Sequence, residues 1–160
     1  MSEFRVDVEK LNKINIAAME KKGLVYPSDE DITNIPHEDK MFPTNISDFT
    51  QEEFLNRQAV FTSLYASAAV NEALAMTEVA GYSRELEIKK GQVMALSGSS
   101  KVTDKRQEAL IDTAVIELQE NLTVAEARLK FLSALKSSYE LYVKLFSRGL
   151  TSKLEERKLQ

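Results

Sequence analysis

The sequence predicts an all-α protein built around one long antiparallel helical hairpin, coiled-coil-like, with an N-terminal helix and an irregular acidic arm. Apolar residues recur at alternating steps of four and three over two stretches, roughly 51–97 and 104–148, which is the pattern of a heptad seam. The run Ser97-Gly98-Ser99-Ser100 separates them and is typical of a tight turn. Only 5 Gly and 3 Pro occur in 160 residues, which favours long helices. We therefore expect two parts: residues 1–49 form the first helix and the arm, and residues 50–160 form the hairpin and a short basic C-terminal helix.

The N-terminal part combines a helical segment with a proline-containing arm. Residues 4–22 are expected to form the first helix. Helical spacing links its apolar residues Phe4, Val8, Leu11 and Ala18, with Ile14 close to the same face. Gly23 suits the left-handed position that ends a helix. Residues 24–49 contain all three prolines and the run Asp29-Glu30-Asp31, so we expect an irregular acidic arm lying on a surface.

The sequence predicts where the first long helix of the hairpin begins. Thr50 and Glu53 have the spacing of a capping box, in which the hydroxyl accepts from the Glu53 amide and the carboxylate accepts from the Thr50 amide. The seam then runs through Phe54, Gln58, Phe61, Tyr65, Ala68, Glu72, Ala75, Val79, Tyr82, Leu86, Lys89, Val93 and Leu96. Its steps alternate four and three throughout, so one face of this helix is expected to pack along a partner helix.

The second long helix of the hairpin repeats the heptad pattern. Thr103 or Asp104 can cap its start, and its seam runs through Ile111, Val115, Leu118, Leu122, Ala125, Leu129, Leu132, Lys136, Tyr139, Val143, Phe146 and Leu150. Further apolar residues widen the face beyond what one partner helix requires, which predicts contact with the first helix or with other copies of the chain. We expect the hairpin seam or the oligomer contact to include Phe61, Tyr65, Val79, Leu118, Leu122, Leu129, Leu132 and Tyr139. An isolated hairpin would have little core per residue, so we expect a homo-oligomer.

The predicted turn also gives a register. Folding the chain about residue 100 places residue i near residue 200 minus i, and so places Glu72 near Arg128. An unpaired carboxylate in the seam would be costly, which favours an ion pair between the two. The alternative is that Glu72 lies at the edge of the seam and reaches water.

Residues for catalysis are sparse. The chain has no Cys, and His37 is its only histidine, so no usual zinc cluster or activated thiol can form. Asp29, Asp31 and Thr33 occupy alternate positions of a calcium-like loop, but Lys40 stands where that loop needs its bidentate Glu. We expect a protein that is not an enzyme and needs no metal or cofactor. No apolar run approaches the ~18 residues of a membrane helix, so we expect no membrane partner.

Basic side chains gather at two places in the sequence. The predicted hairpin tip carries six of them between Arg84 and Arg106, against three acidic residues, and the C-terminal tail carries four more from Arg148 onward. Lys and Arg near aromatic rings can bind single strands, because cations follow phosphates and rings stack on bases. The candidate nucleic-acid-binding residues are Lys89, Lys90, Lys101, Lys105, Arg106, Arg148, Lys153 and Arg157. The alternative is a solvated surface for these cations, with Tyr139 and Phe146 in the heptad seam and therefore in the core, whereas Tyr142 lies off the seam.

The C-terminal stretch carries a family resemblance. A long helix ending in Leu145-Phe146-Ser147-Arg148-Gly149-Leu150, followed by a short basic helix through Lys153 and Arg157, resembles the C-terminus of UvsY-type recombination mediators of T-even-like phages. In that family a Ser-Arg-Gly tripeptide closes a similar helix, and the likeness covers about residues 51–160. The family also has a Lys-x-Arg element before its Ser-Gly turn, associated with DNA contact. Here Lys90 and Gln92 occupy the matching positions, so one cation is missing, although Lys89 or Lys101 could compensate.

The resemblance implies a ring-forming oligomer that binds single-stranded DNA and hydrolyses nothing. Such a protein helps a RecA-like recombinase to replace a single-strand-binding protein during phage recombination, in the cytoplasm of the host cell. The alternative is a phage structural or assembly protein (a neck, capsid-accessory or scaffold-like component) that uses the hairpin only to oligomerise and resides in the virion. A third reading is an adaptor that presents its acidic N-terminal part to a basic partner.

Overall fold

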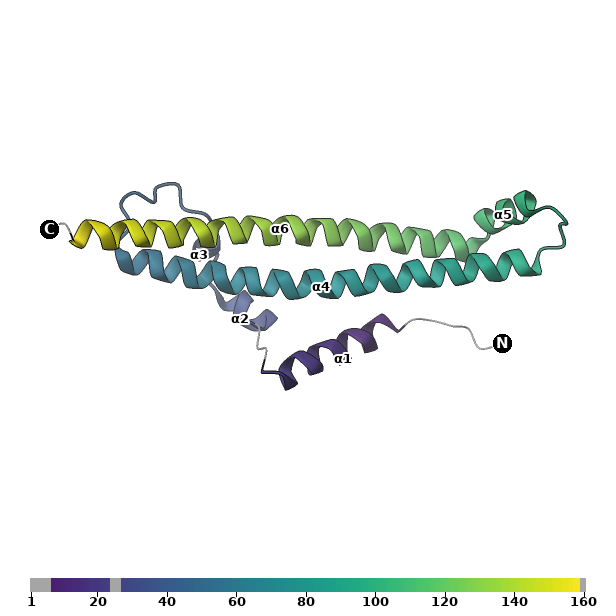
Figure 1. Ribbon diagram of the computed structural model, residues 1–160, viewed down its shortest axis with the longest axis horizontal. Helices are drawn as coiled ribbons and strands as arrows, with labels where there is room; N and C mark the ends of the chain where they lie inside the picture. Colours follow the sequence, from purple (N-terminus) through teal and green to yellow (C-terminus); the bar gives the residue numbers. More distant parts are fainter. Residues whose placement is uncertain (1–6, 24–26, 159–160) are drawn as a thin grey trace. The chain divides into compact units, whose positions relative to one another are not determined.

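The computed structural model describes residues 7–23 and 27–158, and all regular structure within these ranges is helical. The helices are α1 (Val8–Lys21), α2 (Asp29–Asn34), α3 (His37–Lys40), α4 (Gln51–Leu96), α5 (Val102–Ile111) and α6 (Thr113–Lys158). The long helices α4 and α6 pack against each other (Figure 1), which confirms the predicted all-α hairpin. Residues 4–6 of the expected first helix and 24–26 of the expected arm lie outside the described residues.

The contacts divide the chain into two compact units. The first, here called the tip unit, comprises Met1–Gly23 and Ala73–Lys130, and the second, the aromatic unit, comprises Leu24–Glu72 and Phe131–Gln160. Both α4 and α6 contribute one part to each unit, as their residue numbers require. Each unit has a hydrophobic core of its own.

The aromatic unit is built around stacked rings from both long helices. Its buried residues are Phe54, Phe61, Leu64 and Phe146. Phe61 and Phe146 are fully buried, and their ring centroids lie 5.4 Å apart. Aromatic pairs at this separation add to the energy of area burial. These rings therefore hold the α4 and α6 segments of this unit together.

The arm is more regular than the sequence predicts. Instead of an irregular segment it contains α2 and α3, and Ser28 caps α2 because its hydroxyl accepts from the Asp31 amide at 3.1 Å. Its apolar residues Ile32, Ile35, Ile46 and Phe49 pack against the aromatic core. Phe42 of the arm stacks on Tyr142 of α6, with 4.6 Å between ring centroids. The arm is thus part of the core of the aromatic unit.

A glycine allows α6 to approach α4 closely. A Cβ placed on Gly149 would lie 2.3 Å from Cε1 of Phe54, far inside van der Waals contact. Since Phe54 is buried, its ring occupies the space that any side chain at position 149 would need. The helix continues through Gly149 to Lys158, so the expected separate C-terminal helix is wrong, and the basic tail forms the last turns of α6.

The tip unit has an aliphatic core. Leu86, Val115 and Leu122 are its buried residues. Partly buried side chains around them are Val79, Tyr82, Val93 and Leu118. Ala109 of α5 is also buried. The expectation of one helix from residue 104 onward is wrong, because Asp112 ends α5 and begins α6: its Oδ1 accepts from the amides of Ala114 and Val115 at 3.0 and 3.2 Å.

Both units are antiparallel hairpin segments, but their register differs from the predicted one. In the aromatic unit Glu72 pairs with Lys136, and in the tip unit Glu78 pairs with Arg128 at 3.3 Å. The sums of the paired residue numbers are therefore 208 and 206, not 200. The predicted pairing of Glu72 with Arg128 is wrong, and so is the alternative in which Glu72 reaches water, since Glu72 is only 6% exposed.

The eight residues expected in the hairpin seam or the oligomer contact are all at least half-buried. Phe61 and Leu122 are buried, whereas Tyr65, Val79, Leu118, Leu129, Leu132 and Tyr139 are half-buried. Half-burial of seam residues is typical of a two-helix contact, in which each side chain has only one partner helix to cover it.

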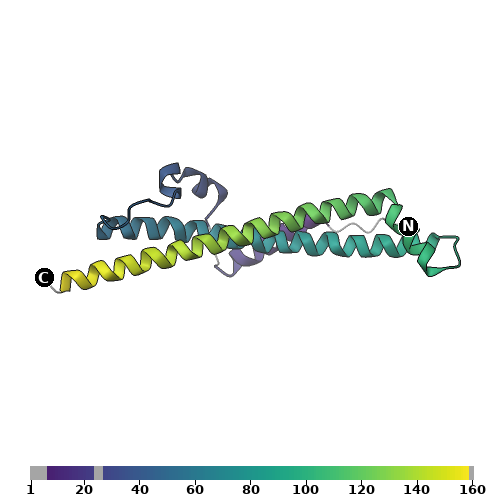
Figure 2. The ribbon, with the colours of Figure 1, turned by 90° about the horizontal axis from the view of Figure 1, so that it is seen from above.

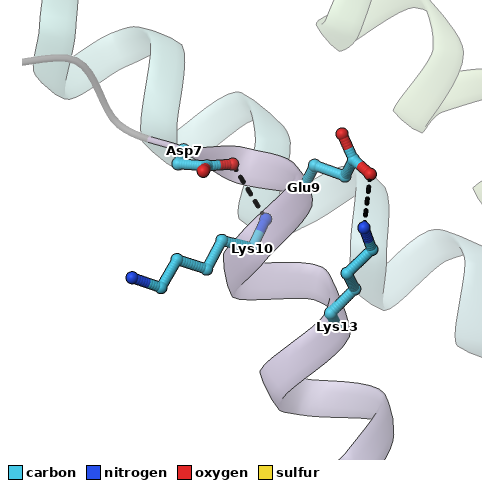
Figure 3. A network of polar contacts seen from close by, with 4 residues as sticks. All are labelled: Asp7, Glu9, Lys10 and Lys13. Carbon is cyan, nitrogen blue, oxygen red and sulfur yellow. Dashed lines mark hydrogen bonds and ion pairs between the residues drawn. The ribbon is translucent and has the colours of Figure 1, made fainter.

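Helix α1 begins with a local polar network (Figure 3). Asp7 caps it by accepting from the Lys10 amide at 2.9 Å, and Lys13 pairs with Glu9 at 2.6 Å one turn away. Leu11 and Ile14 are exposed, although helical spacing predicts them on the packed face. Figure 2 shows the ribbons of α4 and α6 from a second direction, turned by 90°.

Candidate nucleic-acid interface

The tip of the hairpin is formed by the last turns of α4, the loop 97–101 and α5 (Figure 1). Side-chain hydroxyls order this loop: the Ser99 amide donates to Oγ of Ser97 at 3.2 Å, and the Lys101 amide donates to Oγ of Ser99 at 3.3 Å. These bonds replace the helical backbone bonds that end at α4, because hydroxyls in turns satisfy backbone groups locally. Thr103 and Asp104, which the sequence predicts as helix caps, do not cap α5, whose N-cap residue is Lys101 without a side-chain bond.

The five candidate cations of the tip, Lys89, Lys90, Lys101, Lys105 and Arg106, all belong to the tip unit. Lys101 and Arg106 are exposed, whereas Lys89, Lys90 and Lys105 are half-buried. Within the described part of the chain, none of the five lies within 4.0 Å of a carboxylate oxygen. The carboxylate of Asp104, which precedes Lys105 in the sequence, accepts from the hydroxyls of Ser99 and Thr103 at 3.3 and 3.4 Å and not from a lysine. Their charges therefore remain available to an external anion.

Lys90 also borders a hollow in the tip unit. The hollow measures about 520 Å³, and its walls come from α4, α5 and α6. Its lining residues besides Lys90 are Leu110, Val115, Ile116, Gln119, Glu120, Thr123 and Val124. No ring is among them, so the hollow offers an apolar wall beside a cation but no platform on which a base could stack.

The three C-terminal candidate cations lie in the aromatic unit. Two of them already bind a side chain of the same unit. Lys153 pairs with Glu156 at 3.5 Å, and Arg157 donates to Oε1 of Gln51 at 2.8 Å. Arg148 is exposed and has no ion-pair partner among the described residues. Of the tail cations proposed from sequence, Arg148 is therefore the one best placed for an external partner.

The aromatic residues that precede the tail belong to the core. Phe146 is fully buried, and Tyr139 and Tyr142 are partly buried against the same cluster. Burial raises the pKa of the Tyr139 hydroxyl above its ordinary value. Tyr142 lies between Phe42 and Phe61, at ring separations of 4.6 and 5.2 Å. These contacts favour the core alternative for Tyr139 and Phe146, and they place Tyr142, which lies off the predicted seam, against the same core.

A buried ion pair dominates the electrostatics of the aromatic unit. The ammonium of Lys136 donates to the Glu72 carboxylate. This bond, followed by one from Ser133, lowers the pKa of Glu72, and the same bond raises the pKa of Lys136. Both shifts favour the charged forms, because the hydrogen bond and the opposite charge of the partner outweigh the opposing effect of desolvation. The pair therefore links α4 and α6 within the aromatic unit.

One polar contact of the aromatic unit was not predicted from the sequence. Arg57 of α4 donates to the backbone carbonyl of Glu38 at 2.9 Å and pairs with Asp39 at 3.0 Å. It therefore fastens α3 to the start of α4. The sequence indicates this contact only through Arg57, a single cation in the first turns of α4, and the acidic residues of the arm.

Within residues 7–23 and 27–158, no group of three or more His, Asp and Glu side chains is placed to hold a metal ion. None of the helices that the structure describes combines the length and apolar character needed to span a bilayer.

Comparison with known proteins gave no match. No family model matches the sequence, and no curated protein or solved structure is significantly similar to it.

Proposed function

We propose that the protein is a non-catalytic, self-assembling protein that binds single-stranded DNA through the tip of its hairpin, in the manner of a recombination mediator. One observation carries the proposal: five cations of the tip unit lie on neighbouring elements without a carboxylate partner among the described residues. Unpaired cations gain from phosphate contact because each contact releases a condensed counterion. The resemblance of residues 51–160 to UvsY-type mediators supports the same function.

The chemistry of the tip favours binding without sequence preference. Four of the five cations are lysines, and a lysine ammonium is a point charge on a flexible stem rather than a planar fork. Such groups follow the backbone of a strand and read no bases. Binding of this kind is easily reversed, which suits a protein that helps a recombinase to replace a single-strand-binding protein.

Fluorescence anisotropy with a labelled single-stranded oligonucleotide tests the proposal. The wild type is titrated at low and moderate salt beside a variant in which Lys90, Lys101, Lys105 and Arg106 are all changed to Ala. Because single-strand affinity falls with a log-log slope of about 0.7 per phosphate contact, removal of four contacts reduces the slope by up to ~3. A matched control changes Lys10, Lys13, Lys21 and Lys22 of the α1 region to Ala, which alters net charge by the same amount.

Each outcome of the anisotropy titration leads to a different conclusion. Salt-sensitive binding that the tip variant loses and the α1 variant keeps supports the tip as the interface. Equal loss in both variants would reduce the effect to net charge, and absence of wild-type binding at low salt would overturn the proposal. Loading of a RecA-like recombinase onto strands coated with single-strand-binding protein then tests the mediator role itself.

An assembly protein of a phage particle is the second candidate. The observation that favours it is the apolar surface left exposed on α6, where Phe131 and Leu141 are 66% and 65% exposed. Surfaces of this kind mark contacts with other chains. An assembly protein would form oligomers, ignore DNA and sediment with particles.

A further inference from the structure

The hollow of the tip unit has the size and the lining of a ligand site. Its volume of about 520 Å³ falls within the range of about 300–1,000 Å³ that is usual for pockets binding small molecules. Half of its lining residues are aliphatic, namely Leu110, Val115, Ile116 and Val124. All of its lining residues belong to the tip unit, so one compact unit forms the whole site.

The aliphatic wall of the hollow is exposed to solvent. Leu110, Ile116 and Val124 are 61%, 44% and 69% exposed, whereas Val115, which also belongs to the core of the unit, is 2% exposed. Ile116 and Val124 are eight residues apart, which is about 12 Å along the axis of α6. A ligand with an aliphatic body would remove this wall from water, and such burial is favourable in proportion to its area.

Lys90 brings a positive charge to the apolar wall. The Glu78–Arg128 pair sets the pairing of α4 with α6 in the tip unit, and in that register Lys90 lies level with Ile116. The Lys90 side chain is half-buried and has no ion-pair or hydrogen-bond partner among the described residues. A partly desolvated ammonium gains from an anionic partner. The charge of Lys90 therefore complements an anionic group placed beside the wall.

Glu120 limits the ligand to a single negative charge. It also lines the hollow, and it lies about one turn of α6 from both Ile116 and Val124. Within the described part of the chain, no cation lies within 4.0 Å of its carboxylate. A second anionic group in the hollow would meet this carboxylate, and like charges in contact disfavour binding.

We infer that the hollow binds a small organic anion with one negative charge and an aliphatic body, of the fatty-acid class, whose carboxylate pairs with Lys90. The inference goes beyond the proposed function, because its ligand is a small molecule, and it does not depend on DNA binding. It gives Lys90 a role separate from phosphate contact.

Isothermal titration calorimetry of the full chain with decanoate tests the site. Wild type is expected to bind one decanoate per chain. Lys90→Met keeps an unbranched side chain but removes the charge, and it is expected to weaken binding about tenfold or more, as for the loss of a charge-assisted hydrogen bond. The matched control is Lys89→Met, because Lys89 is also half-buried and does not line the hollow.

A second variant tests the aliphatic wall. Ile116→Asp places a carboxylate in the hollow and is expected to abolish decanoate binding. The variant should remain folded, because an acidic residue in the first turn of a helix is favourable, and circular dichroism verifies this.

A second ligand tests the limit on charge. Decanedioate has the same chain with a carboxylate at both ends, and wild type is expected to bind it at least tenfold more weakly than decanoate. Glu120→Gln is expected to reduce this difference, because it removes the like charge from the wall.

Three results would overturn the inference. They are the absence of saturable decanoate binding by wild type, equal losses in Lys90→Met and Lys89→Met, and equal affinities of wild type for decanoate and decanedioate. Binding of N-acetylleucine without binding of decanoate would also overturn it, in favour of the C-terminus of a peptide. The oligonucleotide titration tests the proposed function separately.

Discussion

At the scale of single residues, the contact between Gly149 and Phe54 shows how one missing side chain positions two helices. The ring of Phe54 lies where a Cβ of residue 149 would be, and it is held there by Phe49 and Phe146, at centroid separations of 5.5 and 6.4 Å. It therefore has little freedom to move aside. The glycine of the Ser-Arg-Gly tripeptide has a structural role in this chain, separate from any contact with DNA.

Gly149→Ala is expected to destabilise the protein. Overpacking costs about 1–3 kcal/mol, which exceeds the ~1 kcal/mol that alanine gains over glycine within a helix. Gly91→Ala is the matched control, since Gly91 also lies inside a long helix but has nothing within 4 Å of its Cβ position. Urea denaturation should show a lower midpoint for the first variant and a higher one for the second. A raised midpoint for Gly149→Ala would contradict the close approach.

Residue-scale prediction from the sequence succeeds where the partners are close along the chain. The Thr50–Glu53 capping box is confirmed, because the Glu53 amide donates to Oγ1 of Thr50 at 3.2 Å and the Thr50 amide donates to Oε2 of Glu53 at 2.6 Å. The partner of Glu72 is 64 residues away and depends on the register of two helices. Its identity could not be predicted from local spacing.

At the scale of elements, the break at Asp112 divides the second side of the hairpin into two helices, α5 and α6. The carboxylate of Asp112 satisfies two amides of the first turn of α6, which helical backbone bonds leave without partners. The heptad pattern runs through Ile111 and Val115 without a visible interruption. Periodicity therefore predicts the seam correctly and misses the boundary between α5 and α6.

Asp112→Ala is expected to reduce stability by about 1 kcal/mol, the usual cost of losing a helix cap. Asp104→Ala provides the comparison, because among the described residues the Asp104 carboxylate accepts hydrogen bonds from hydroxyls and not from helix amides. A surface substitution of this kind changes stability by about 0.5 kcal/mol or less. Thermal unfolding followed by circular dichroism measures both. Equal effects of the two variants would argue against a distinct start of α6 at Asp112.

The register error also has its cause at this scale. A heptad seam repeats every seven residues, so sliding one helix by a heptad leaves apolar residues opposite apolar residues. The observed pair sums of 206 and 208 exceed the predicted 200 by about one such step. What selects between these registers is the length of the connection, including α5, together with specific partners such as Glu72 and Lys136.

At the scale of the whole molecule, charge and pH act through the same ion pair. The pKa of Glu72 is lowered by its bond to Lys136, so its contribution is present above the ordinary carboxyl pKa and is lost as the pH falls through the folded value. The pKa of Lys136 is raised, so its contribution is present below 10.5 and is lost as the pH rises through the folded value. The pair therefore stabilises the fold across the neutral range.

We expect the stability difference between wild type and Glu72→Gln to be largest between about pH 5 and pH 10. The difference should shrink on the acid side, where the wild-type carboxylate takes up a proton, and on the alkaline side, where Lys136 loses one. Chemical denaturation at a series of pH values measures it. A difference that stays constant from pH 3 to pH 7 would show that Glu72 acts through packing and not through charge.

The arm has a consequence for where the chain can be shortened. Its residues Phe42 and Phe49 cover rings of α4 and α6, and Arg57 binds α3. A truncated chain that starts at Thr50 would keep both long helices and yet expose the rings that these side chains shield. Such a fragment would bind hydrophobic dyes and aggregate. The smallest fragment of the aromatic unit that keeps its core covered therefore includes the arm.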